Sequence, residues 1–297
     1  MEASKKPDDQ RRAVALWHRA LALVGTALRH NLFQLSASLT YYTVLSLFPA
    51  LFVVVSLLGM IGVSEDTLRT VLDAVAGRTD SQWVVDLVSE MATSIYASPN
   101  TGLFLSVGLL AALWSASGYV RSFMWSSDTI YEVTASRSYF QGLPIRLGLA
   151  VVLLIMFTAA VAIVTLSGPL GRWTAAALGL DTSDVSDLSW FAWPVLYCTA
   201  VLMLTLLFKY APSRHQPAFL RLLPGAALTV IAWIVASIVF NFYLSHFASY
   251  NQVYGALGAA VAALVWAWIL NIAVLAGVEV NNAFEPRNEG SAATPTP

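Results

Sequence analysis

The sequence predicts an all-α, polytopic membrane protein with six transmembrane helices. Of its 297 residues, 58% are hydrophobic and only 11% are charged, whereas a soluble domain carries about 25% charged residues. Five long stretches contain no Asp, Glu, Lys or Arg. Ten Trp, eleven Tyr and fourteen Phe suit a protein whose surface stands at lipid–water boundaries.

The uncharged stretches indicate where the transmembrane helices lie. A helix needs about 20 mostly apolar residues to cross the hydrocarbon core, so each of the first four stretches holds one span. The last stretch, 222–278, is long enough for two, with a break at the polar sequence from His246 to Asn251. The predicted spans are 37–62, 102–123, 147–168, 190–209, 223–244 and 254–280.

Basic residues set the expected orientation. With the N-terminus inside, thirteen of the sixteen Lys and Arg residues fall in cytoplasmic segments and three fall in outer loops. Cytoplasmic loops of membrane proteins carry the excess of Lys and Arg. Both termini are therefore expected on the cytoplasmic side.

Two segments outside the spans have helical periodicity. Apolar residues recur at helical spacing between Val14 and Leu28, which predicts an amphipathic helix that lies on the cytoplasmic surface or packs against the spans. The first outer loop, 64–98, has two shorter runs of the same kind. The expected domains are a cytoplasmic segment (1–30), a six-helix domain (31–285) and a disordered tail rich in Pro, Ser and Thr (286–297).

The first span carries hydroxyl groups that a lipid-facing helix would avoid. Ser38, Tyr42 and Ser46 share one face of a helix with 3.6 residues per turn. A hydroxyl in hydrocarbon needs a hydrogen-bond partner, so this face should meet other helices or water. Pro49 has no N–H and leaves the Leu45 carbonyl without its usual donor, which favours a kink. Two interpretations remain open: the hydroxyls hold helices together, or they line a polar cavity or pathway.

The sixth span divides into a small-residue face and a polar side. The small-residue face, which would let two helices approach closely or allow a homodimer, consists of Gly255, Gly258, Ala259 and Ala262. The further candidates for the cavity or pathway are Asn241 of the fifth span and Trp268, Asn271, Glu279 and Asn282 of the sixth.

Glu279 is the carboxylate that stands near the cytoplasmic end of the sixth span. Charged residues inside a bilayer are costly and often functional. Two alternatives follow for this group: a boundary carboxylate that caps or pairs with Arg121 or Arg146, or a group with a proton or ion role.

Enzymatic activity, cofactors and bound metals are not expected. The chain lacks the P-loop pattern GxxxxGK[ST] of ATP hydrolysis. Its four histidines are scattered, and Asp128 and Glu132, which could share a helix face, have no further ligands for metal-assisted hydrolysis. The net charge of −1 gives no support to nucleic-acid binding. Nuclease activity is therefore not expected either.

Four stretches in the same order carry a family resemblance. They are ASLTYYTVLSLFPALFVVVSLLG (37–59), LWSASGYVRSFMWSSDTIYEV (113–133), RLLPGAALTVIAWIVASIVFNFYLSHFASYNQVYGALGA (221–259) and VWAWILNIAVLAGVEVNNAFE (265–285). Together they resemble the YihY / virulence factor BrkB family of bacterial inner-membrane proteins. The resemblance implies six spans, both termini inside and a place in the inner membrane. Members have carried ribonuclease BN, virulence-factor and lipid-transporter labels, and none of these supplies a catalytic motif to transfer.

These observations favour a transporter or translocator of a lipid or other amphiphile in envelope homeostasis, with membrane lipid as its partner. The motivation is a hydroxyl-bearing first span, a sixth span with asparagines, and spans almost without charge. The alternative is a structural or assembly factor of the cell envelope without transport activity. The sequence names no substrate.

Overall fold

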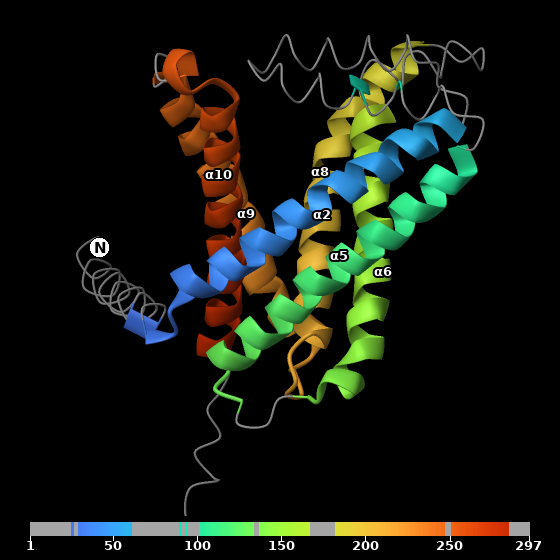
Figure 1. Cartoon of the computed structure of the whole chain (residues 1–297). Helices are drawn as coiled ribbons and strands as arrows, with labels where there is room; N and C mark the ends of the chain where they lie inside the picture. Colours follow the sequence, from blue (N-terminus) through green and yellow to red (C-terminus); the bar gives the residue numbers. More distant parts are fainter. Residues whose placement is uncertain are drawn as a thin grey trace, which may run out of the picture.

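Six long helices make up the computed structural model, which describes residues 25–26, 29–60, 89–90, 93, 101–133, 137–166, 182–246 and 251–284. Within these residues the chain forms no strand. The helices are α2 (Leu32–Met60), α5 (Thr101–Ile130), α6 (Tyr139–Leu166), α8 (Thr182–Tyr210), α9 (Phe219–His246) and α10 (Asn251–Ala283) (Figure 1).

The six helices form a closed ring in chain order. Each packs against the next one along the chain, α10 closes the ring on α2, and α10 also contacts α5. Short connections place α5 beside α6, α8 beside α9 and α9 beside α10. The closing contact brings together helices from opposite ends of the chain, and α10 therefore has three helical partners.

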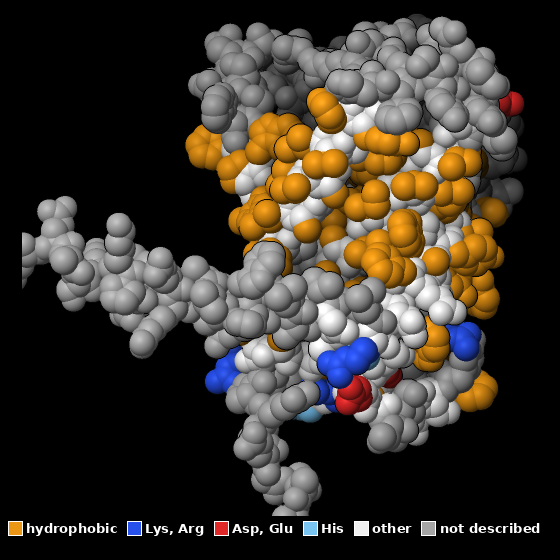
Figure 2. Space-filling model, turned by 90° about the vertical axis from the view of Figure 1, so that its left-hand side faces the viewer, with side chains coloured by type: hydrophobic (Ala, Val, Ile, Leu, Met, Phe, Trp, Pro, Cys, Tyr) orange, Lys and Arg blue, Asp and Glu red, His pale blue; other side chains and the backbone are white. Residues whose placement is uncertain are grey.

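One end of the ring, which we call the basic end, collects positive charge. It is the end at which α2, α6 and α9 begin and α5, α8 and α10 finish (Figure 1). Figure 2 shows Lys and Arg side chains grouped below a broad apolar belt. The basic residues of the described chain are Arg29, Arg121, Arg137, Arg146, Lys209, Arg214 and Arg221.

The core is concentrated near the basic end. Phe123 of α5 and Phe208 of α8 are fully buried, and their rings stack with centroids 5.9 Å apart. The other large, fully buried side chains of the described residues come from the same half of the ring: Leu39, Val120, Ile130, Thr205, Leu222, Thr229, Val274, Leu275 and Val278. These side chains fill the centre of the ring there.

Packing loosens toward the opposite end. No described side chain between Ile231 and Tyr243 of α9 is buried. On α10, Val261, Leu264 and Trp266 are exposed. Figure 1 shows α9 and α10 lying apart from α6 and α8 at this end. The α2–α5 pair stays packed, because Gly108 and Gly118 of α5 admit the rings of Phe52 and Tyr42.

The all-helical class is confirmed, and each predicted span overlaps one helix. Within the described residues, five helices are long and apolar enough to cross a membrane: Leu32–Val53, Phe140–Val161, Phe191–Tyr210, Phe219–Tyr243 and Ala260–Ala283. α5 is not among them, although its residues 101–120 contain no Asp, Glu, Lys or Arg. With 30 residues it is nevertheless long enough, because a helix rises about 1.5 Å per residue.

Three predicted features fall largely outside the described residues. Of the amphipathic segment 1–30, the structure describes only four residues near its end. Of the outer loop 64–98 it describes residues 89–90 and 93, which are helical. The tail 286–297 lies outside the described chain altogether.

Among the described glycines, Gly225 and Gly277 mark a close contact between α9 and α10. A Cβ atom built on Gly225 of α9 would collide with the Gly277 carbonyl oxygen of α10. One built on Gly277 would collide with Thr229 Oγ1 and lie 2.8 Å from the Gly225 carbonyl oxygen. Of the predicted face, Gly258 and Ala262 are half-buried, and the side-chain surroundings of Gly255 and Ala259 lie outside the described part.

Replacing Gly277 by alanine should therefore destabilise the protein. Overpacking of a tight contact costs about 1–3 kcal/mol, and the new methyl group would strike Thr229. Thermal unfolding of the purified protein in detergent measures the loss. The control is Gly148→Ala on α6, where the space is open and alanine favours the helix by about 0.5–1 kcal/mol. Equal midpoints for the two variants would contradict the proposed contact.

Candidate functional site

A polar seam joins α2, α5 and α10, and Asn271 is its centre. Asn271 is 4% exposed. Its Nδ2 lies 3.3 Å from Thr40 Oγ1 and 3.1 Å from Thr43 Oγ1 on α2, and 2.9 Å from the Ala267 carbonyl oxygen. Its Oδ1 accepts a hydrogen bond of 3.1 Å from the Tyr119 hydroxyl of α5. One side chain thus links three helices.

The first span contributes more hydroxyls to this seam. Ser38 Oγ lies 2.8 Å from Ser122 Oγ of α5. Tyr42 is half-buried with its ring against Gly118, and it makes an edge contact with Tyr41. We define the polar seam as Ser38, Thr40, Tyr42, Thr43, Ser46, Tyr119, Ser122 and Asn271.

Ser46 and Pro49 stand at the far edge of the seam. α2 continues through Pro49 as a single helix. The Ser46 hydroxyl donates to the Thr43 carbonyl over 2.9 Å, not to that of Leu45. Both Ser46 and Pro49 are half-buried. Beyond them α2 remains packed, since Val53 and Val55 are buried.

The end of α10 is tied to α2 and α5 by polar contacts. His30 Nδ1 lies 2.5 Å from Glu279 Oε1, and His30 Nε2 lies 3.5 Å from Glu132 Oε1. Glu279 is 4% exposed. Its carboxylate thus pairs with His30. Asn282 Nδ2 donates to the Ile130 carbonyl at the end of α5 over 3.2 Å.

Further polar contacts hold the same face of α10. The Trp268 indole N–H donates to the Phe33 carbonyl over 3.0 Å. Asn281, which the sequence reasoning missed, accepts from the Gly225 N–H over 3.1 Å and donates to the Leu222 carbonyl over 3.3 Å. Pro224 interrupts the N–H series of α9 just before Gly225, which is a signal that a side chain from elsewhere could serve this turn.

Asn241 stands apart from the other candidates. It is exposed near the end of α9 opposite the basic end. The other eight candidates lie on α2 and α10, which pack against each other, whereas Asn241 of α9 lies outside this pair of helices.

Asp128 fastens the end of α5 to the connection between α8 and α9. Ser213 donates to its carboxylate twice, from the backbone N–H over 2.7 Å and from Oγ over 2.5 Å. The Arg137 N–H donates to the same Ser213 hydroxyl over 3.2 Å. A carboxylate in the last turn of a helix is repelled by the negative end of the helix dipole. The hydrogen bonds from Ser213 offset this repulsion and stabilise Asp128 there.

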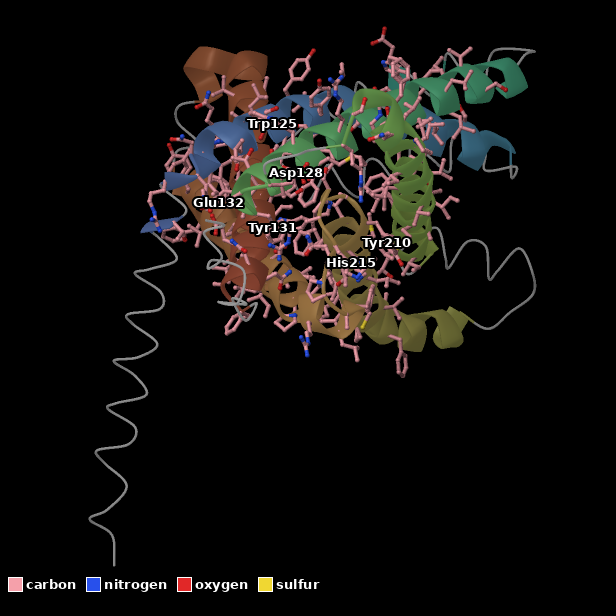
Figure 3. The ribbon with its side chains drawn as sticks, turned by 90° about the horizontal axis from the view of Figure 1, so that it is seen from below. Trp125, Asp128, Tyr131, Glu132, Tyr210 and His215 are labelled. Carbon is pink, nitrogen blue, oxygen red and sulfur yellow. The ribbon has the colours of Figure 1, made fainter. Side chains whose placement is uncertain are left out.

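The turn after α5 separates the two carboxylates that the sequence placed on one helix face. Glu132 has φ of 51°. Val133 N–H donates to the Asp128 carbonyl and Glu132 N–H donates to the Thr129 carbonyl, which together form a Schellman motif. Seen from the basic end (Figure 3), Asp128, Tyr131 and Glu132 follow each other along this end of α5. Asp128 is buried, whereas the Glu132 side chain is 80% exposed.

Tyr131 lies buried in this turn under a guanidinium group. Arg214 Cζ stands 4.3 Å from the centre of the Tyr131 ring, a cation–π arrangement. Burial raises the pKa of Tyr131 to about 12, against a smaller lowering by Arg214, and the charge of Glu279 raises this pKa further. The phenol therefore stays neutral at physiological pH.

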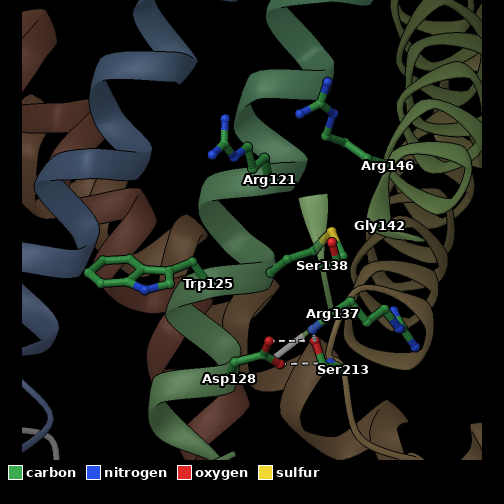
Figure 4. A pocket seen from close by; sticks show the side chains of 9 residues that line it. Arg121, Trp125, Asp128, Arg137, Ser138, Gly142, Arg146 and Ser213 are labelled. Atoms are coloured by element: carbon green, nitrogen blue, oxygen red, sulfur yellow. Dashed lines mark hydrogen bonds between the residues drawn. The ribbon is translucent and has the colours of Figure 1, made fainter. Parts of the chain in front are cut away.

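A pocket of about 200 Å³ opens between α5, the start of α6 and Ser213. Its charged lining consists of Arg121, Arg137, Arg146 and Asp128. Figure 4 shows Arg146 extending from α6 toward α5, with Arg121 on α5 at a similar height. The remaining lining residues are Met124, Trp125, Ser138, Gly142 and Ser213. In the residues that the structure describes, no three His, Cys, Asp or Glu side chains are grouped as metal ligands.

Comparisons with known proteins reveal relatives over most of the chain. The family model described as virulence factor BrkB matches residues 23–296, which confirms the resemblance read from the four stretches. A ribonuclease-like protein, YfkH, of Bacillus subtilis (strain 168) is 27% identical over 254 residues, which cover 86% of this chain and 90% of that protein.

UPF0761 membrane proteins of Xanthomonas are also similar. One from Xanthomonas campestris pv. campestris (strain B100) is 25% identical over 266 residues, which cover 89% of this chain and 58% of that protein. One from Xanthomonas axonopodis pv. citri (strain 306) is 25% identical with similar coverage. The chain thus matches little more than half the length of these relatives. No solved structure matches it.

Removing the Asn271 amide should loosen the junction of three helices. Asn271→Leu leaves Tyr119 and Thr43 without their partner, and interhelical hydrogen bonds in membranes are worth about 0.6–2 kcal/mol. We expect a loss of that size in the thermal unfolding of the purified protein. Asn241→Leu is the matched control, because the exposed Asn241 should leave stability within about 0.5 kcal/mol. An unchanged midpoint for Asn271→Leu would refute a structural role.

Asp128→Ala should destabilise the basic end. It removes two hydrogen bonds from Ser213 to a carboxylate, and a bond to a charged group is worth about 1.5–3 kcal/mol. The thermal midpoint should therefore fall clearly. Glu132→Ala is the comparison, since an exposed side chain of this kind changes stability by about 0.5 kcal/mol or less. If both variants behaved alike, Asp128 would not be the fastening point.

Proposed function

The chain belongs to the virulence factor BrkB family of membrane proteins, and we propose that it is a transporter or translocator of a lipid or other amphiphile in the bacterial inner membrane. The family membership and the apolar helices make it a multi-pass membrane protein. The transport activity itself is our proposal.

The packing asymmetry of the ring carries this proposal. Near the basic end the centre is filled by Phe123 and Phe208, whereas toward the other end α9 and α10 lie apart from α6 and α8 (Figure 1). A carrier that exposes its site to one side at a time needs one closed end and one end at which its helices can separate. The ring has this form.

The polar seam lies at the border between the two regions. On α10, Asn271 is buried, while Val261 and Trp266, one to three turns away, are exposed. On α2, Tyr42 and Ser46 of the seam are half-buried. Hydroxyl and amide groups at this depth could serve the polar part of an amphiphile as it passes, since lipid tails offer them no hydrogen bonds.

The proposal includes an orientation and a sixth span. We place the basic end on the cytoplasmic side, because positive charges accumulate there. α5 then crosses the bilayer as well, packed against α2, α6 and α10. The halves α2–α5–α6 and α8–α9–α10 would each contain three spans.

The alternative is a structural or assembly factor of the envelope. The hydrogen bonds of the seam favour this alternative, because they join helices of this chain to one another. Such contacts hold a bundle together whether or not anything is moved. The transport measurement separates the two functions.

Reconstituted vesicles test the proposal. Vesicles that contain the full chain and a fluorescent phosphatidylglycerol should move this lipid between leaflets faster than protein-free vesicles. Ser46→Ala and Tyr42→Ala should slow the movement by roughly fivefold if each removes about 1 kcal/mol of barrier stabilisation. The rate at which a quencher added outside eliminates fluorescence gives the measurement.

Leu45→Ala supplies the control, because Leu45 is exposed on another face of α2. It should leave the rate unchanged. No acceleration over protein-free vesicles would reject lipid translocation and favour the assembly factor. Equal slowing by Leu45→Ala would reject the role of the seam.

A further inference from the structure

The pocket at the basic end has an excess of positive charge. Three arginines line it, against the single carboxylate of Asp128, and Arg137 Nη1 also donates to the Tyr210 and Ala211 carbonyls. Both oxygens of that carboxylate already accept hydrogen bonds from Ser213. Arg146 is only 6% exposed, and three arginines around one cavity create a positive potential that attracts an anion. The lining therefore suits a negatively charged group.

The geometry of the donors fits a phosphate in particular. A guanidinium group offers parallel N–H donors that match two oxygens of a phosphate. The pocket also lies at the beginning of α6, since Ser138 and Gly142 belong to its wall. The first N–H groups of a helix and the positive end of its dipole attract phosphate groups.

The pocket stands at the boundary between apolar and charged surface. Trp125 lines it and is 60% exposed. Phe140, in the first turn of α6, is 79% exposed. Exposed aromatic residues of this kind lie at the head-group level of a bilayer. A ligand that enters here can keep apolar tails in the lipid beside α5 and α6.

The size of the pocket also favours a head group over a whole lipid. Sites that enclose a drug-sized molecule measure about 300–1,000 Å³, whereas this pocket measures about 200 Å³. At roughly 30 Å³ per water, the volume equals about seven waters. That space accommodates a phosphate with a short polar head, while acyl chains must remain outside.

We propose that this pocket binds the phosphate group of an anionic phospholipid, with Arg121, Arg137 and Arg146 as the recognising side chains. The inference rests on the proposed function and names the substrate class for it. Free phosphate shares the same chemistry, and the experiment distinguishes the two sources.

Binding to the purified full chain in detergent tests the proposal. The probes are dihexanoyl phosphatidylglycerol, dihexanoylglycerol, which lacks the phosphate, and inorganic phosphate. Titration calorimetry should give saturable binding of the first probe and much weaker binding of the other two. Arg146→Gln should weaken the binding of phosphatidylglycerol by roughly 10-fold or more, as expected for a lost hydrogen bond to a charged group.

Two further variants provide a second test and a control. Arg121→Gln changes an exposed pocket residue, so it tests recognition even if Arg146→Gln fails to fold, and it should also weaken binding by several-fold. Arg221→Gln removes the same charge from the same end of the bundle, outside the pocket and exposed. It should leave the affinity within about twofold.

Three outcomes would overturn the inference. Equal weakening by Arg221→Gln would mean diffuse attraction, and equal binding of dihexanoylglycerol would mean that phosphate is not recognised. Inorganic phosphate that binds as tightly as the lipid would assign the pocket to a free anion. The vesicle assay remains independent: translocation without pocket binding would leave the proposed function intact, and binding without translocation would leave the pocket intact.

Discussion

Polar groups at membrane depth must find their partners inside the protein, and this constraint organises the whole ring. Lipid tails offer no hydrogen bonds, so the Asn271 amide turns to Thr40 and Thr43 of α2 and to Tyr119 of α5. One amide from the last helix thereby positions the first two. The closing contact between α10 and α2 depends on it, and the closed ring in turn fixes where every other helix stands.

Close helix packing and hydrogen bonds between polar side chains act together at the basic end. Gly225 and Gly277 let the backbones of α9 and α10 touch, and Asn281 serves the N–H that follows Pro224. Asp128 binds Ser213 and so joins α5 to the connection between α8 and α9. The opposite end has no comparable set of contacts among the described residues. A ring held firmly at one end is suited to opening at the other, which is the basis of the proposed translocation.

Two acidic residues of the described helices, Asp128 and Glu279, have structural partners in this arrangement. Asp128 and Glu132 share a helix face in the sequence, but the Schellman motif at the end of α5 directs one to Ser213 and the other toward solvent. Glu279 pairs with His30. The ribonuclease-like name of the Bacillus relative describes that protein. In this chain the pocket beside Asp128 is dominated by arginines, whose chemistry is the binding of anions.

The sequence by itself determined the helical class, the positions of the long apolar segments and the polarity of the first and last helices. These follow from local composition and helical period, which act over a few turns. Only the tertiary structure decided that His30 meets Glu279, that Gly225 of α9 lies against Gly277 of α10, and that Arg121, Arg137 and Arg146 share one pocket. These pairs lie far apart in the chain or on different helices. No local pattern specifies them, because they depend on which helices become neighbours when the ring closes.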